Sequence, residues 1–232
     1  MKQIALDIGL HTGPTLTNFF AGSSGAANAA ALQHLNLWSN SSTRSPVPTY
    51  LWGESSSGKS HLLKASAHAL RELGVHVGWL DASIHNPPMF DESWAAVLMD
   101  DVHLYTAQQQ HAAFNWFINA MTPSTGQQRW VLAAGATPPA DLILREDLRT
   151  RLGWGHVFAL QVLSEPERRA VLRKEADARG VFLSDEVMDF MLNRFSRDLG
   201  SLMELLDAID GYALQSKKSI TVPLIKAMMD AG

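Results

Sequence analysis

The sequence predicts an α/β domain, in which helices cover both faces of a mostly parallel sheet, followed by a small all-helical domain. Short apolar segments that have the character of strands alternate with helical patterns through the first two thirds of the chain. After Leu163 only helical patterns follow. The chain has 232 residues, of which 46% are hydrophobic and 18% charged, so it is long and apolar enough to bury a full core.

Five apolar segments are the expected strands of the sheet. The third is apolar throughout, as in a strand that is buried on both faces. Helices are expected between them, and one starts at Thr106, where Gln109 completes a capping box. The expected strands are residues 49–52, 75–80, 95–99, 130–134 and 157–160, and the other expected helices are residues 26–38 and 58–73.

Four further helical patterns make up the expected second domain. The first starts at Ser164, with Glu167 in the position of a capping box and Pro166 inside the first turn. The others start near Ser184, Leu199 and Thr221. We therefore expect a flexible N-terminal segment at residues 1–14, a nucleotide-binding α/β domain at 15–162 and a helical domain at 163–232.

Composition excludes some kinds of site and argues against others. A net charge of −4 and a pI of about 6.1 argue against a dedicated nucleic-acid binder, which would usually be basic. There is no cysteine, which excludes disulfides and cysteine metal sites. The N-terminus lacks a signal pattern, and no apolar run approaches the roughly 18 residues of a membrane span. We expect a cytoplasmic protein without a membrane partner.

Residues 53–60 match the P-loop pattern G-x-x-x-x-G-K-[ST] in full, between an expected strand and an expected helix. Glycines let the backbone approach phosphates closely, and the amides at the helix N-terminus supply partial positive charge. Lys59 is expected to neutralise the terminal phosphates and Ser60 to ligate Mg²⁺. The alternative is a glycine-serine turn with a solvated lysine. The expected nucleotide-binding residues here are Gly53, Ser57, Gly58, Lys59, Ser60 and the adjacent His61.

The segment Val97–Asp101 is an apolar strand that ends in two carboxylates and fits a Walker B element. Asp100 is then expected to hold Mg²⁺ through water, together with Ser60. Asp101 is expected to orient or polarise the attacking water. Solvated aspartates that cap a turn are the alternative.

The P-loop, the two aspartates, the helical domain and the segment Leu148–Gly155 together resemble the AAA+ domain of the replication initiator DnaA. The string R-x-G-W-G is its most specific part. In that family its arginine is an arginine finger that reaches a neighbouring subunit's nucleotide, and Arg151 occupies that position. We expect Arg151 in a turn that Trp154 anchors in the core. The alternative is a structural salt bridge from Arg151 to an acidic neighbour such as Asp147.

Two N-terminal segments extend the resemblance. Asn18 and Phe19 resemble the DnaA segment that flanks the base of the nucleotide. A stand-alone DnaA-like module, without a helix-turn-helix domain, resembles the regulatory inactivators of DnaA, the Hda family. Members carry a sliding-clamp-binding peptide at the extreme N-terminus, although an ordinary edge strand is the alternative here. The residues that resemble this peptide are Gln3, Ile4, Leu6 and Ile8.

The resemblance implies an AAA+ fold with a helical lid and a regulator of replication initiation. Such a regulator binds ADP or ATP with Mg²⁺, docks on the DNA-loaded sliding clamp of DNA polymerase III, and stimulates ATP hydrolysis by DnaA. DNA is then contacted only through the clamp, and a homo-oligomer is compatible with the fold. The alternative is a stand-alone AAA+ ATPase that acts as a helicase loader or DNA-remodelling accessory protein. A small-molecule P-loop kinase is disfavoured by the lid and the arginine segment.

The chain departs from the family at both sensors. The second sensor is an arginine, and the nearest register places Gly200 there, with Arg197 three residues earlier as a substitute. At the first sensor the segment after residue 134 offers only Thr137. Both changes would weaken the chain's own hydrolysis more than its nucleotide binding. We therefore expect a weak intrinsic ATPase at most, and an activator that acts in trans.

Overall fold

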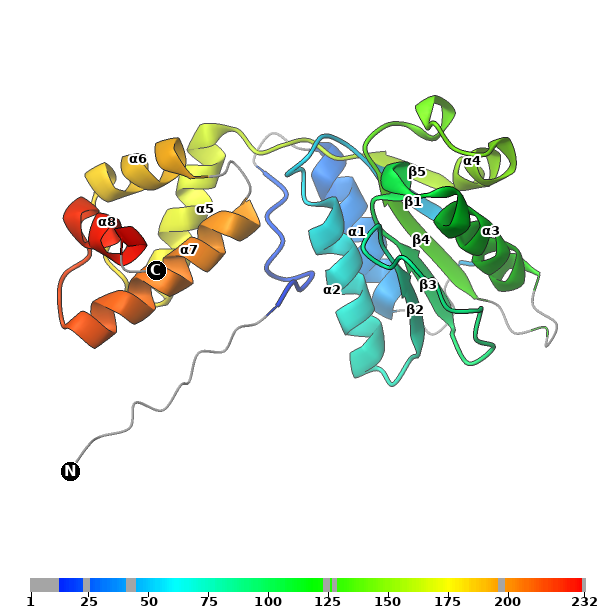
Figure 1. The fold of residues 1–232 in the computed structure, drawn as a ribbon, viewed down its shortest axis with the longest axis horizontal. Coiled ribbons are helices and arrows are strands. Elements are labelled where there is room, and N and C mark those ends of the chain that lie inside the picture. The colour runs from blue at the N-terminus through cyan, green and yellow to red at the C-terminus, as the bar shows by residue number, and fades with distance from the viewer. Residues whose placement is uncertain are drawn as a thin grey trace.

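The computed structural model describes residues 13–22, 26–40, 45–122, 126, 129–195 and 199–230. These residues form a five-stranded parallel sheet covered by helices, and a second group of helices that lies apart from the sheet (Figure 1). The strand order is β2-β3-β4-β1-β5. The strands are β1 (Thr49–Trp52), β2 (Val77–Leu80), β3 (Ala96–Met99), β4 (Trp130–Gly135) and β5 (His156–Ala159).

Two apolar clusters sandwich the sheet because its central strands are apolar on both faces. On one face α1 (Ala26–Asn40) and α2 (Lys59–Glu72) pack over the sheet. On the other lie α3 (Ala107–Met121) and α4 (Glu146–Leu152) (Figure 1). All four residues of β3 are buried, so the strand places the two aspartates that follow it at the carboxyl edge of the sheet.

The helical domain has an apolar core of its own, formed by residues from all four of its helices. Ser164 begins its first helix as expected, because the Ser164 amide and hydroxyl both donate to Glu167 Oε2, at 2.9 and 2.7 Å. Ion pairs Arg173–Asp185 and Arg179–Asp207 join neighbouring helices. The helices are α5 (Glu165–Ala178), α6 (Asp185–Arg194), α7 (Leu199–Ser216) and α8 (Val222–Asp230).

The expectation of a simple turn around Arg151 is wrong, because residues 146–152 form the short helix α4. Leu148 and Leu152 are buried one turn apart, which gives the helix an apolar face that spans only two residues. Its first turn is acidic and its last turn basic, and both ends therefore suit the helix dipole. Two 3₁₀ helices, η1 (Val102–Leu104) and η2 (Pro139–Asp141), complete this side of the sheet.

The described segment before α1 lies between the two domains (Figure 1). A Cβ built on Gly22 would lie 3.0 Å from Glu167 Oε1, at the start of α5. At its other end the Thr15 carbonyl lies 3.0 Å from His61 Nε2, on α2. The segment thus contacts both domains. No helix in the described residues is both long enough and apolar enough to cross a membrane.

Candidate nucleotide-binding site

The P-loop connects the end of β1 to the first turn of α2. Gly53 has φ +156°, and a Cβ there would lie 2.3 Å from the Leu160 carbonyl oxygen, so only glycine fits. Gly58 has φ +93° and precedes the first helical residue. Ser56, with φ +65°, also adopts a left-handed conformation that a non-glycine residue rarely takes. The loop therefore has the tight backbone geometry that the sequence pattern predicts.

Lys59 lies over the backbone of this loop. Its side chain is buried, and Nζ donates to the carbonyl oxygens of Gly53 and Glu54, each at 2.8 Å. Burial lowers the pKa of Lys59, although the nearby Asp101 and Asp100 carboxylates oppose this change. The carbonyl contacts keep the ammonium group at the mouth of the loop, where a phosphate held by the loop amides would meet it.

The two carboxylates after β3 lie beside the P-loop helix. Asp100 is 4% exposed and accepts a hydrogen bond from the Ser60 hydroxyl. Burial raises its pKa, with a further increase from the Asp101 charge, while the Ser60 hydrogen bond acts in the opposite direction. Asp101 has φ +50° and its amide donates to Asp100 Oδ1 at 3.0 Å. The structure thus brings together Ser60 and Asp100, the two oxygen donors expected at a Mg²⁺ site.

The segment before α1 forms one wall of the site. The Phe19 ring packs on Gly58 and lies 5.5 Å, centroid to centroid, from the His61 ring. The Asn18 side chain instead bonds within its own segment. Its Oδ1 accepts a hydrogen bond from the Thr15 amide at 2.9 Å and so stabilises a turn there. The expected clamp-binding residues Gln3, Ile4, Leu6 and Ile8 lie outside the described residues.

Arg151 is held by aromatic rings. Its guanidinium carbon lies 4.7 Å from the centroid of Trp154 and 5.3 Å from that of Phe114. The expected core position of Trp154 is wrong, since its side chain is 57% exposed and contacts Phe117 edge-on at 6.5 Å. Exposure of this ring leaves its face available to the neighbouring guanidinium.

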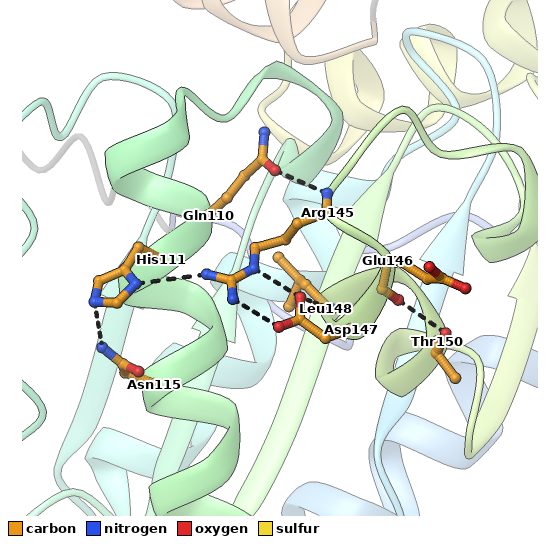
Figure 2. Close-up of polar contacts among 8 residues, drawn as sticks. All are labelled: Gln110, His111, Asn115, Arg145, Glu146, Asp147, Leu148 and Thr150. Carbon is orange, nitrogen blue, oxygen red and sulfur yellow. Dashed lines mark hydrogen bonds and ion pairs between the residues drawn. The ribbon is translucent and has the colours of Figure 1, made fainter.

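The alternative salt bridge from Arg151 to Asp147 is also wrong. Asp147 instead accepts two hydrogen bonds from Arg145, from Nε at 2.7 Å and from Nη2 at 2.6 Å, which lower the pKa of Asp147 (Figure 2). Sequence reasoning missed Arg145, although an arginine two residues before an aspartate at a helix start is a recognisable signal. In the described part of the chain Arg151 pairs with no carboxylate, so its charge is not neutralised there.

The sensor positions add little to the site. Gly200 is an exposed residue of α7 without a side chain to offer, and Arg197 lies outside the described residues. At Thr137 the backbone carbonyl accepts a hydrogen bond from the Tyr50 hydroxyl at 2.9 Å, which fixes the chain after β4.

Comparison with known proteins agrees with this architecture. The family described as "Hda, lid domain" matches residues 165–229, which are the helices that follow the sheet. Domain III of DnaA from Thermotoga maritima has a TM-score of 0.66 at 19% identity, covering 94% of this chain and 95% of that one. The chain therefore has the fold of the DnaA AAA+ domain, and its C-terminal helices match the Hda lid-domain family.

Two further solved structures share this fold, and one sequence relative matches the chain over nearly its whole length. AMPPCP-bound DnaA from Aquifex aeolicus gives a TM-score of 0.64 at 19% identity, covering 85% of this chain and 65% of that one. A RuvB mutant from Thermotoga maritima gives 0.64 at 13% identity, covering 94% and 72%. An uncharacterized protein of Haemophilus influenzae is 28% identical over 234 residues, covering 99% of both chains. The chain therefore has at least one sequence relative of nearly the same extent.

Proposed function

We propose that this chain is an adenine-nucleotide-binding regulator of replication initiation, which uses Arg151 to stimulate ATP hydrolysis by DnaA. The observation that carries the proposal is the guanidinium of Arg151, which contacts two rings and pairs with no carboxylate among the described residues. A guanidinium can make two hydrogen bonds to a phosphate, and one supplied in trans is worth about 10³ or more in rate. The presence of an Hda lid supports DnaA as the partner.

The chain's own site binds the nucleotide rather than consuming it rapidly. The loop amides and Lys59 bind the phosphates, and the rings of Phe19 and His61 lie beside the loop. Ser60 and Asp100 would hold Mg²⁺, which supplies charge neutralisation at the phosphates. The buried Asp100 oxygens beside a hydroxyl suit a hard, oxygen-preferring cation. Two DnaA structures of the same fold contain AMPPCP, which supports an adenine nucleotide as the ligand.

The N-terminal peptide is the proposed attachment to the sliding clamp of DNA polymerase III. Extended peptides enter partner pockets through a few anchors, here Gln3 in a polar notch with Leu6 and Ile8 in an apolar one. Replacing Gln3 and Leu6 together with alanine should abolish clamp pull-down and leave nucleotide affinity unchanged. Retention of clamp binding by this double variant would remove the peptide from the proposal.

An ATP turnover assay with purified components tests the function as a whole. We expect little turnover by the chain alone, and strong stimulation of DnaA hydrolysis only when clamp and duplex DNA are both present. The chain should also bind bare duplex weakly, because its net charge is −4. Rapid turnover by the chain alone, with tight and salt-sensitive binding to bare duplex, would instead identify a helicase loader or remodelling ATPase.

A further inference from the structure

An arginine that acts on a partner must be held in place without losing its charge. A free arginine side chain has about 2 kcal/mol of rotamer entropy, part of which is lost whenever it is fixed in one geometry. A carboxylate partner would fix it but would also neutralise it. An aromatic face attracts the cation and leaves its donors available. The Arg151 guanidinium contacts aromatic rings and no carboxylate in the described part of the chain, whereas Arg145, the residue just before the same helix, pairs with the Asp147 carboxylate.

The two rings that hold Arg151 come from different parts of the chain. Trp154 follows α4, its amide donates to the Arg151 carbonyl at 3.1 Å, and its ring contacts Phe117 edge-on. Phe114 belongs to α3 and also lies 4.6 Å from the Arg145 guanidinium. The ring of Phe114 therefore lies under both arginines.

The backbone of α4 is tied to α3 at its start. The Arg145 amide donates to Gln110 Oε1 at 3.0 Å, and Arg145 Nη1 lies 3.5 Å from His111 Nδ1 (Figure 2). These contacts, and the buried Leu148 and Leu152, fix the helix that carries Arg151. Only the side chain of Arg151 then remains to be oriented, and the two rings are the groups that contact its guanidinium.

We propose that Trp154 and Phe114 are positioning residues, which orient the Arg151 guanidinium for entry into the nucleotide site of a partner AAA+ subunit. This inference rests on the proposed function. An arginine that is oriented in advance loses little entropy in the transition state, so the rings act on the rate of the chemical step. The rings contribute less to the affinity between the two proteins.

A set of variants separates positioning from mere surface packing. Trp154→Leu should lower the saturating rate of stimulated DnaA hydrolysis about tenfold, since a cation–π contact is worth about 0.5–2 kcal/mol. The concentration for half-maximal stimulation should change less than twofold. Trp154→Phe, which keeps a ring, should restore most of the rate. Phe114→Leu should act as Trp154→Leu does, and Ile143→Ala, at a fully exposed apolar residue, is the matched control.

A measurement on the isolated chain tests the contact between Arg151 and the Trp154 ring independently of the proposed function. In NMR spectra the Nε–H proton of Arg151 should be shifted upfield by the ring current, lose that shift in Trp154→Leu and keep it in Trp154→Phe. If Arg151→Ala leaves stimulation intact, the proposed function fails. If Arg151→Ala abolishes stimulation, but Trp154→Leu keeps the full rate or the arginine proton does not move, the positioning role is overturned.

Discussion

The ring of Phe19 lies directly against Gly58, the glycine that precedes the P-loop lysine. A Cβ built on Gly58 would come within 2.7 Å of Phe19 Cε2. The segment before the first helix is thus packed against the loop, and an alteration at either residue would move the other. This contact connects a part of the chain outside the sheet to the candidate nucleotide site.

Gly58→Ala should lower the affinity for ADP at least about tenfold, measured by calorimetry. The new methyl group would displace Phe19, and φ +93° would cost roughly 1–3 kcal/mol in a non-glycine residue. Gly74→Ala is the control, since Gly74 has φ +73° with no atom within 4 Å of the added Cβ. Equal ADP affinity in the two variants would show that the Phe19 contact does not shape the site.

Lys59→Ala should weaken ADP binding by about 2–4 kcal/mol, because it removes the side-chain cation that lies over the P-loop. The exposed Lys64, on the same helix, supplies the control variant Lys64→Ala. Unchanged ADP affinity in Lys59→Ala would remove the P-loop assignment.

Arg129 should be among the residues most important for stability in the α/β domain. It is buried and donates to the carbonyls of Trp94 and Glu92, at 2.9 and 2.8 Å, and it pairs with the Glu92 carboxylate. Arg129→Met should lower the free energy of unfolding by about 2–4 kcal/mol in urea titrations, since both carbonyls lose their donor. Glu92→Gln, at a half-exposed partner, should cost less, and a larger loss there would contradict this account.

His34 should make stability depend on pH. Burial lowers its pKa, and the adjacent His156 lowers it further, while Nε2 shares a 2.9 Å hydrogen bond with Thr49 Oγ1. The folded state therefore binds this proton less readily than the unfolded state does. The contribution of neutral His34 to stability is therefore complete above the unfolded pKa of about 6.5. This contribution is lost as pH falls below that value.

Unfolding titrations at several pH values test this expectation. The wild type should lose stability below about pH 6.5, and His34→Gln should lose clearly less. His85→Gln, at an exposed histidine, should follow the wild type. Parallel curves for the wild type and His34→Gln would contradict the assignment.

Local patterns predicted most of the fold. The five strands and the long helices are set by short-range spacing and caps. Thr106 and Gln109 are an example, because the side chain of each accepts the expected hydrogen bond from the backbone amide of the other. The P-loop is a contiguous string, so its geometry also follows from local sequence. Helix α4 was missed because an apolar face of two leucines gives almost no periodic signal.

The surroundings of Arg151 could not be predicted because they depend on tertiary contacts. Phe114 reaches the arginine from α3, far away in the sequence. Asp147 is spaced for a helical pair with Arg151, but Arg145 lies just before the helix and folds forward onto the carboxylate. Trp154 was expected in the core because tryptophan is mostly buried, whereas its exposed face binds a cation.

The most direct test of the central claim is the single-turnover rate of ATP hydrolysis by DnaA, measured with clamp-loaded DNA and saturating regulator. Arg151→Ala should fold, bind ADP and bind the clamp as the wild type does, yet lower the stimulated rate by about 10³. Arg149→Ala, at an arginine on the same helix, should stimulate normally. A normal rate with Arg151→Ala would contradict activation in trans by this residue, and loss with Arg149→Ala alone would transfer the role to Arg149.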